Sequence, residues 1–157
     1  MKQTEKARRA VFIIFILYCI TMLLLLFARR TVYFTGSYAE QLKMNLNLVP
    51  FDTMRRFIYV LRHSSNPYML KFAHINLGGN VAAFVPFGFF LPYLYAKQRK
   101  FIVFFASAVG TIVAVELTQL FTLRGSCDID DLILNLIGSI LGFLSWRIFA
   151  GAAREKS

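Results

Sequence analysis

Four apolar stretches constrain the fold of this chain more than any other feature of its sequence. Each approaches the roughly 20 residues that an α-helix needs to cross a hydrocarbon core of about 30 Å. With 57% hydrophobic and 17% charged residues, the 157-residue sequence is also too apolar for a soluble domain of this size. We therefore predict an all-α membrane protein with one domain, residues 1–157, and four transmembrane helices at about residues 10–28, 75–95, 101–123 and 130–149.

Lys and Arg residues are concentrated in three short segments: the N-terminal flank, the turn between the second and third stretches, and the C-terminus. With four crossings, these segments lie on one side of the membrane, and the excess of basic residues assigns that side, with both termini, to the cytoplasm. The formal net charge of +10 follows from this topology and from Lys and Arg side chains at helix ends. The sequence lacks the interleaved basic and aromatic residues of known nucleic-acid modules, so we expect no nucleic-acid partner.

Residues 31–72 form the one long connection between apolar stretches, on the outer side in this topology. Within it, Asp52 can cap a short helix that has an apolar face, with Arg55, Arg56 and Arg62 on its other faces. This pattern favours a short interfacial helix over a fifth span. Arg55 and Arg56 then either bind the phosphates of lipid headgroups or of an anionic substrate, or simply face solvent.

Polar residues recur inside the apolar stretches at one depth. They come in three pairs spaced three or four residues apart: Asn76 and Asn80, Glu116 and Gln119, and Asp131 and Asn135. Each pair therefore lies on one face of a helix. A carboxylate or amide in hydrocarbon costs several kcal/mol unless it has a partner, so three pairs at one level predict a polar chamber near the outer surface. For the two Asn residues of the second stretch, hydrogen bonding between helices and ligand binding both remain open.

The densest polar run begins at Arg124 and continues through Asp128, Asp130 and Asp131. Acids at the start of a helix are stabilised by its dipole and by its free amides, which accounts for one or two of these aspartates but not for all three beside Glu116. The four acids are therefore candidate acid–base groups, or ligands for a divalent cation. We expect Arg124, the only basic residue of this short loop, to pair with at least one of them.

Glycines indicate where the helices approach one another closely. Gly138 and Gly142 have the small-xxx-small spacing of tightly packed membrane helices. In the second stretch, Gly78, Gly79 and Gly88 also leave room for a neighbouring backbone. We expect the second and fourth helices to use these positions for packing.

Several of these motifs together resemble the VanZ-like family of bacterial integral membrane proteins. The resemblance rests, in order, on Asn47-Leu48-Val49-Pro50-Phe51, residues 76–80 with 84–88, residues 116–119, and the run from Arg124 to Gly138. It covers about residues 46–142 and implies a multi-pass protein of the bacterial cytoplasmic membrane. The family is best known for members that lower susceptibility to teicoplanin, a glycopeptide with a lipid tail. The resemblance implies a role in the cell envelope but no particular reaction.

Three functions from different classes remain open. The first is a cell-envelope factor that binds a membrane lipid, a lipid-linked envelope component or a lipoglycopeptide at the outer face, with Arg55 and Arg56 at headgroups. The second is a membrane-embedded enzyme acting on a lipid through the four acids, with or without a metal ion. The third is a small lipid transporter, which would require a homo-oligomer. The candidate ligand-binding residues are Asn47, Asn76, Asn80, Glu116, Gln119, Arg124, Asp128, Asp130, Asp131 and Asn135.

Overall fold

The computed structural model describes residues 5–27 and 36–155. Within these ranges the chain is almost entirely helical, with two strands of two residues each. In chain order the elements are α1 (Glu5–Phe27), α2 (Tyr38–Met44), β1 (Leu46–Asn47), α3 (Asp52–His63), α4 (Pro67–Leu94), the 3-10 turn η1 (Ala96–Arg99), α5 (Phe101–Phe121), β2 (Cys127–Asp128) and α6 (Ile129–Glu155).

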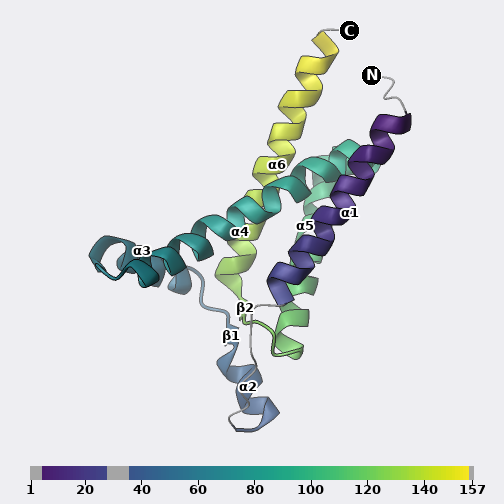
Figure 1. Cartoon of the computed structure of the whole chain (residues 1–157). Helices are drawn as coiled ribbons and strands as arrows, with labels where there is room; N and C mark the ends of the chain where they lie inside the picture. The colour runs from purple at the N-terminus through teal and green to yellow at the C-terminus, as the bar shows by residue number, and fades with distance from the viewer. Residues whose placement is uncertain (1–4, 28–35, 156–157) are drawn as a thin grey trace.

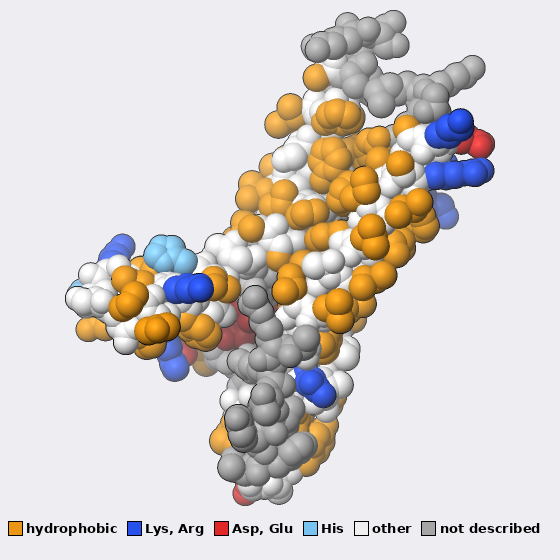
Figure 2. Space-filling view, in the orientation of Figure 1, with side chains coloured by type: hydrophobic (Ala, Val, Ile, Leu, Met, Phe, Trp, Pro, Cys, Tyr) orange, Lys and Arg blue, Asp and Glu red, His pale blue; other side chains and the backbone are white. Residues whose placement is uncertain are grey.

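Four of these helices, α1, α4, α5 and α6, are long and apolar enough to span a membrane. This confirms the predicted all-α membrane fold with four transmembrane helices. The start of α1 and the end of α6 lie at one end of the molecule, and β1, β2 and α2 lie at the other (Figure 1). Hydrophobic side chains cover much of the visible surface of the long helices (Figure 2), as expected where helices contact lipid.

Helix α4, the second of the four predicted spans, starts at Pro67, well before its predicted boundary at about residue 75. Helix α6, the fourth predicted span, continues to Glu155, beyond its predicted end at about residue 149. The early start of α4 has a local cause. Pro67 suits the first position of a helix, and the side chain of Asn66 accepts hydrogen bonds from the backbone N–H groups of Tyr68 (2.9 Å) and Met69 (3.4 Å). The caps, and not hydropathy, therefore determine where the helix begins.

The predicted interfacial helix is present as α3, which packs against the first turns of α4. The rings of Phe57 and Phe72 meet edge to face, with their centroids 5.7 Å apart. The two segments form a helical hairpin that projects sideways from the bundle (Figure 1). We refer to α3 together with residues 67–75 as the α3–α4 arm.

Asp52 does not cap α3, contrary to the sequence prediction. The N-cap position is held by Phe51, whose φ is 65° and whose side chain makes no capping hydrogen bond. Asp52 is instead the first helical residue, and its carboxylate pairs with Arg56 at 2.7 Å. The first N–H groups of α3 therefore require an acceptor from outside the helix.

The connection before α3 contains two elements that the hydropathy pattern does not indicate. The helix α2 begins with a capping box: Ser37 Oγ accepts a hydrogen bond from Glu40 N (3.3 Å), and the Glu40 carboxylate accepts one from Ser37 N (2.7 Å), which lowers the pKa of Glu40. Strand β1 then pairs in parallel with β2, with Asn47 opposite Asp128. This short pairing holds the start of the arm against the start of α6.

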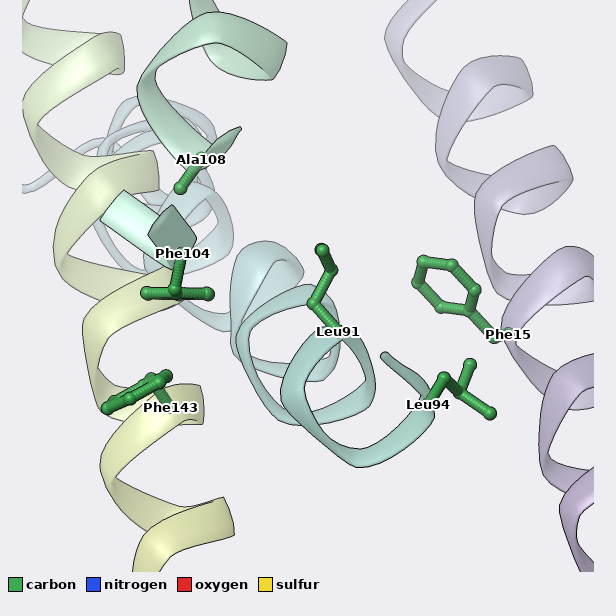
Figure 3. Close-up of a cluster of buried hydrophobic side chains, with 6 residues drawn as sticks. All are labelled: Phe15, Leu91, Leu94, Phe104, Ala108 and Phe143. Atoms are coloured by element: carbon green, nitrogen blue, oxygen red, sulfur yellow. The ribbon is translucent and has the colours of Figure 1, made fainter. Parts of the chain in front are cut away.

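The four spanning helices meet in a hydrophobic cluster (Figure 3). Its members come from every spanning helix, and each is less than one-tenth exposed. In Figure 3 the aromatic rings from α5 and α6 lie on one side of α4, and the ring from α1 lies on the other. The cluster consists of Phe15 of α1, Leu91 and Leu94 of α4, Phe104 and Ala108 of α5, and Phe143 of α6.

Helices α4 and α6 cross with their backbones in direct contact. A Cβ atom added at Gly138 would overlap the carbonyl oxygen of Val81, and one added at Gly142 would overlap that of Val85. Gly88 is in the same position relative to α6. The predicted packing role therefore holds for these three glycines but not for Gly78 and Gly79, which have no neighbouring backbone within 4 Å.

Replacing Gly142 by Ala should destabilise the protein by about 1 to 3 kcal/mol, because the added methyl group forces α4 and α6 apart. Thermal unfolding in detergent measures this. Gly110→Ala is the matched control, because nothing lies within 4 Å of a Cβ atom there. The control should unfold at the same temperature as the wild type or slightly above it, and equal losses for the two variants would contradict the close crossing.

Candidate functional site

A partly open cavity of about 300 Å³ lies between α1, α4, α5 and α6 at the end of the bundle that carries β2. Apolar side chains of α1 form one wall, and Gly79, Gly125 and Ser126 leave part of the lining without bulky groups. We call it the polar cavity after seven of its lining residues, all of which the sequence had singled out: Asn76, Asn80, Glu116, Gln119, Arg124, Asp131 and Asn135.

Hydrogen bonds across the polar cavity connect its helices. Asn80 Nδ2 of α4 donates to Asp131 Oδ1 of α6 at 2.6 Å. Gln119 Nε2 of α5 donates to the carbonyl oxygen of Leu26 in α1 at 3.0 Å. Asn76 takes no part in this bridging, because its amide donates to Phe72 O of its own helix at 2.7 Å. One of the two amides of α4 thus connects helices, as the structural interpretation of these residues anticipated.

Two buried polar groups of the cavity have few or no partners. Glu116 is 4% exposed, and its Oε2 accepts a hydrogen bond from the backbone N–H of Asp128 at 3.3 Å. Asn135 is also 4% exposed, and within the described part of the chain its Oδ1 has no hydrogen-bond partner. A buried acceptor left without a donor costs about 1 to 3 kcal/mol. The cavity therefore has unused capacity to accept hydrogen bonds.

Asp128 lies outside the polar cavity, in the junction between β1, β2 and α3. Its Oδ2 accepts hydrogen bonds from Thr53 Oγ1 (2.6 Å) and Asn47 Nδ2 (3.2 Å), and its Oδ1 accepts one from Asp130 N (2.9 Å). Only 7% of Asp128 is exposed. Oδ2 thus holds the connection and the start of α3 against the start of α6, and Oδ1 is used within the start of α6 itself.

Asp130 supplies the cap that α3 lacks. Its carboxylate is fully buried and accepts hydrogen bonds from the backbone N–H groups of Phe51 (2.5 Å) and Met54 (2.9 Å). An acid at the N-terminus of a helix satisfies free N–H groups and is stabilised by the helix dipole. Asp130 therefore fixes the α3–α4 arm to the start of α6. The predicted cluster of four acids is divided into Glu116 and Asp131 at the cavity and two aspartates in the junction.

Arg124 forms no ion pair with any acid that the structure describes, so the predicted pairing is wrong for that part of the chain. α5 ends at Phe121, and Leu123 beyond it adopts a φ of 53°. Gln119 O then accepts hydrogen bonds from the backbone N–H groups of Arg124 (3.0 Å) and Gly125 (3.2 Å). The side chain of Arg124 is exposed and lines both the polar cavity and a neighbouring apolar groove between α1 and α5. It is a cation at the rim, not one neutralised in the core.

Arg55 and Arg56 lie on the exposed side of α3. Arg55 Nε donates to Phe51 O at 3.1 Å, and Arg56 pairs with Asp52 at the surface. Neither residue lines the polar cavity. Any contact with lipid headgroups would therefore be made by the arm, separately from the cavity.

Comparison with known proteins gives a family but no closer relative. The model of the family described as VanZ/LLP1 matches residues 14–150. The chain belongs to the VanZ/LLP1 family. No curated protein and no solved structure matches it. Family membership, already indicated by the ordered motifs, thus extends over all four spanning helices and includes the polar cavity and the junction.

Sequence reasoning missed one participant in the junction of this VanZ/LLP1 chain, Thr53. Its hydroxyl donates to Asp128 and accepts a hydrogen bond from Asn47 Nδ2 at 3.0 Å. The only signal was its place directly after the Asn47–Phe51 motif, and a single Thr at a helix start is too common to indicate a contact with a residue 75 positions away. The parallel pairing of β1 with β2 was needed to bring these residues together.

The described residues contain no group of three or more His, Cys, Asp or Glu side chains placed to hold a metal ion. Cys127 lies close to the acids, and its own burial, with the negative charges of Glu116 and Asp128, raises the pKa of its thiol. A raised pKa keeps the thiol protonated at neutral pH, and the thiolate is the nucleophilic form. The polar side chains that line the cavity are amides, acids, the hydroxyl group of Ser126 and the guanidinium group of Arg124.

Asp130→Ala should lower the stability of the protein by about 2 kcal/mol, because the N–H groups of Phe51 at the N-cap and of Met54 in α3 lose a buried acceptor. The measurement is the unfolding temperature in detergent, together with the rate of proteolysis in the segment before α3, which should increase. Asp52→Ala is the matched control, since its surface ion pair is worth at most about 1 kcal/mol. If the two variants behave alike, the capping role of Asp130 is incorrect.

Proposed function

We propose that this protein is a bacterial cell-envelope factor that binds the polar head of a lipid-linked ligand or lipoglycopeptide in the polar cavity, at the outer leaflet. Binding there lowers susceptibility to teicoplanin-like antibiotics. The observation that carries the proposal is the composition of the cavity, in which carboxylates and amides face an apolar wall of α1. A ligand with a polar head and a lipid tail needs both kinds of surface. Membership of the VanZ/LLP1 family supports the antibiotic part of the proposal.

The distribution of charge supports an outward-facing cavity. Figure 2 shows Lys and Arg side chains at the end of the bundle where α1 begins. The turn η1 adds Lys97 and Arg99, and Lys100 follows it. Arg8 Nη2 donates to Leu94 O at 3.2 Å, so the start of α1 lies beside the end of α4. The positive-inside rule assigns this end to the cytoplasm. The polar cavity lies toward the opposite end of the bundle and therefore faces outside.

The α3–α4 arm fits the interface between lipid and water on the same side. It exposes large apolar side chains such as Ile58, Tyr59 and Phe72, and it also carries Arg55 and Arg62. An amphipathic helix of this kind lies in the headgroup region with its apolar face toward the acyl chains. The arm would hold the mouth of the cavity at headgroup depth.

A membrane-embedded enzyme acting on a lipid is the second candidate. It is favoured by one observation: two carboxylates, Glu116 and Asp131, line the same cavity. Asp128 and Asp130 would not take part, because their carboxylates are bound to the donors of the junction. Complete loss of function in well-expressed Glu116→Gln and Asp131→Asn variants, reproduced by chelators, would favour this candidate over binding.

A larger side chain that fills the polar cavity should remove the function without unfolding the chain. Gly79 lines the polar cavity, and a Cβ atom there would meet only a side-chain methyl group of Ile75 at 3.7 Å. Gly79→Leu should therefore abolish protection against teicoplanin in a susceptible bacterial host. The neighbouring variant Gly78→Leu is the control, because Gly78 is exposed and does not line the cavity.

The assay compares survival on teicoplanin with survival on a glycopeptide that lacks the lipid tail, at equal membrane levels of the variants. Full protection by Gly79→Leu, or equal losses in the two glycine variants, would place the function elsewhere on the protein.

The orientation can be tested by cysteine labelling in intact cells. In a background with Cys19 and Cys127 replaced by serine, Ser65→Cys in the turn of the arm should react with a membrane-impermeant maleimide. Lys97→Cys in η1 should react only after the cells are permeabilised. The reverse pattern would place the polar cavity on the cytoplasmic side.

A further inference from the structure

We propose that the polar cavity receives a headgroup with a primary ammonium group beside a phosphate. The ammonium group lies against Glu116, Asp131 and Asn135, and the phosphate lies against Arg124. The inference rests on the proposed function, because it names the chemical class of ligand for the same cavity. Phosphatidylethanolamine is the simplest lipid with this headgroup.

The wall that α5 and α6 present to the polar cavity is rich in hydrogen-bond acceptors. A carboxylate offers about four acceptor positions. Asp131 receives a hydrogen bond from Asn80, and Glu116 receives one from the backbone of Asp128. Within the described chain, no Lys, Arg or His nitrogen lies within 4.0 Å of a Glu116 oxygen. A ligand that binds against Glu116 and Asn135 must therefore bring hydrogen-bond donors.

Asn135 supplies an independent reason for a donor-bearing ligand. Asn135 lines the same cavity, and its Oδ1 is buried and has no hydrogen-bond partner in the described structure. Buried carbonyl oxygens of side chains are rarely left in this state, so the atom marks a position where a donor belongs. An ammonium group carries three N–H donors. One can go to Asn135 and the other two to the carboxylates.

Arg124 is suited to the other half of such a headgroup. Its side chain lines the rim of the cavity and pairs with no acid among the described residues. The planar guanidinium group binds phosphate oxygens with two parallel hydrogen bonds. Hydrogen-bond acceptors inside the cavity and a cation at its rim match a headgroup whose ammonium group enters first and whose phosphate stays at the rim.

The size of the cavity agrees with this ligand. A volume of about 300 Å³ corresponds to about ten water-sized groups. A phosphoethanolamine group fits within that volume. An acyl chain does not need to enter, because the apolar groove beside Arg124, lined by Ile20, Leu23, Leu24 and Phe27, can carry it.

A divalent cation is the competing occupant. Ca²⁺ and Mg²⁺ take six or more oxygen ligands. The aspartates that would complete such a set, Asp128 and Asp130, are engaged with Thr53 and with the N-terminus of α3. An ammonium group needs only three acceptors, which Glu116, Asp131 and Asn135 provide.

The test is native mass spectrometry of the full chain in detergent, titrated with lipids that have identical acyl chains. Phosphatidylethanolamine should bind at least about tenfold more tightly than phosphatidylcholine, whose trimethylated nitrogen has no N–H donor. It should also bind more tightly than phosphatidylglycerol, which lacks the positive charge. Equal binding of the ethanolamine and choline lipids, tighter binding of phosphatidylglycerol, or displacement of lipid by Mg²⁺ would overturn the inference.

Matched variants assign the two halves of the headgroup. Glu116→Gln and Asn135→Leu should each reduce the preference for ethanolamine over choline, whereas Arg124→Gln should weaken all three phospholipids about equally. Glu5→Gln, an exposed acid near the start of α1, is the control and should change nothing. A preference for ethanolamine that survives in both Glu116→Gln and Asn135→Leu would contradict the assigned contacts. The selectivity of the wild type keeps the inference testable even if a variant fails to fold.

Two further measurements identify the source of the ligand and distinguish failure of this inference from failure of the proposed function. Displacement of the lipid by millimolar phosphoethanolamine would identify a soluble source for the same chemistry, and lack of displacement would identify the lipid itself. If no lipid or lipoglycopeptide binds at all, the proposed function fails. If ligands bind without preference for the amine, the proposed function stands and only this inference fails.

Discussion

The structure depends on how two buried aspartates satisfy the start of a helix that cannot cap itself. Phe51 occupies the N-cap of α3, and its side chain offers no acceptor. The carboxylate of Asp130 therefore accepts the N–H groups of Phe51 and Met54, and Asp128 holds the preceding loop. Buried N–H groups cannot rely on water, and each one left unsatisfied costs about 1 to 3 kcal/mol. The arm, the β1–β2 pairing and the start of α6 are therefore fixed as one unit.

This arrangement determines which acids remain for a ligand. Because Asp128 and Asp130 are used by the junction, Glu116 and Asp131 are the carboxylates left to line the polar cavity. The direct backbone contact between α4 and α6 at Gly138 and Gly142 brings Asn80 within hydrogen-bonding distance of Asp131. One set of interactions thus builds the end of the bundle that carries β2, and the polar groups beside it line the cavity.

Periodicity and hydropathy were sufficient to predict the spanning helices and the side chains of the polar cavity, because both depend on residues close in sequence. The same reasoning could not separate Asp128 and Asp130 from Glu116 and Asp131, since their partners lie 75 or more residues away on α3 and in the loop before it. It also paired Arg124 with an acid, whereas the turn after Leu123 leaves that side chain at the rim. The capping box at Ser37, by contrast, was readable from sequence and was overlooked.

The most direct test of the account is an experimental structure of the protein purified with its native lipids, at a resolution that shows bound headgroups. The account predicts density for a polar headgroup inside the cavity, in contact with Glu116 and with Oδ1 of Asn135, while Asp128 and Asp130 remain bound to the loop and to α3. A cavity filled only by acyl chain or closed by its own side chains, with the headgroup density elsewhere, would contradict it.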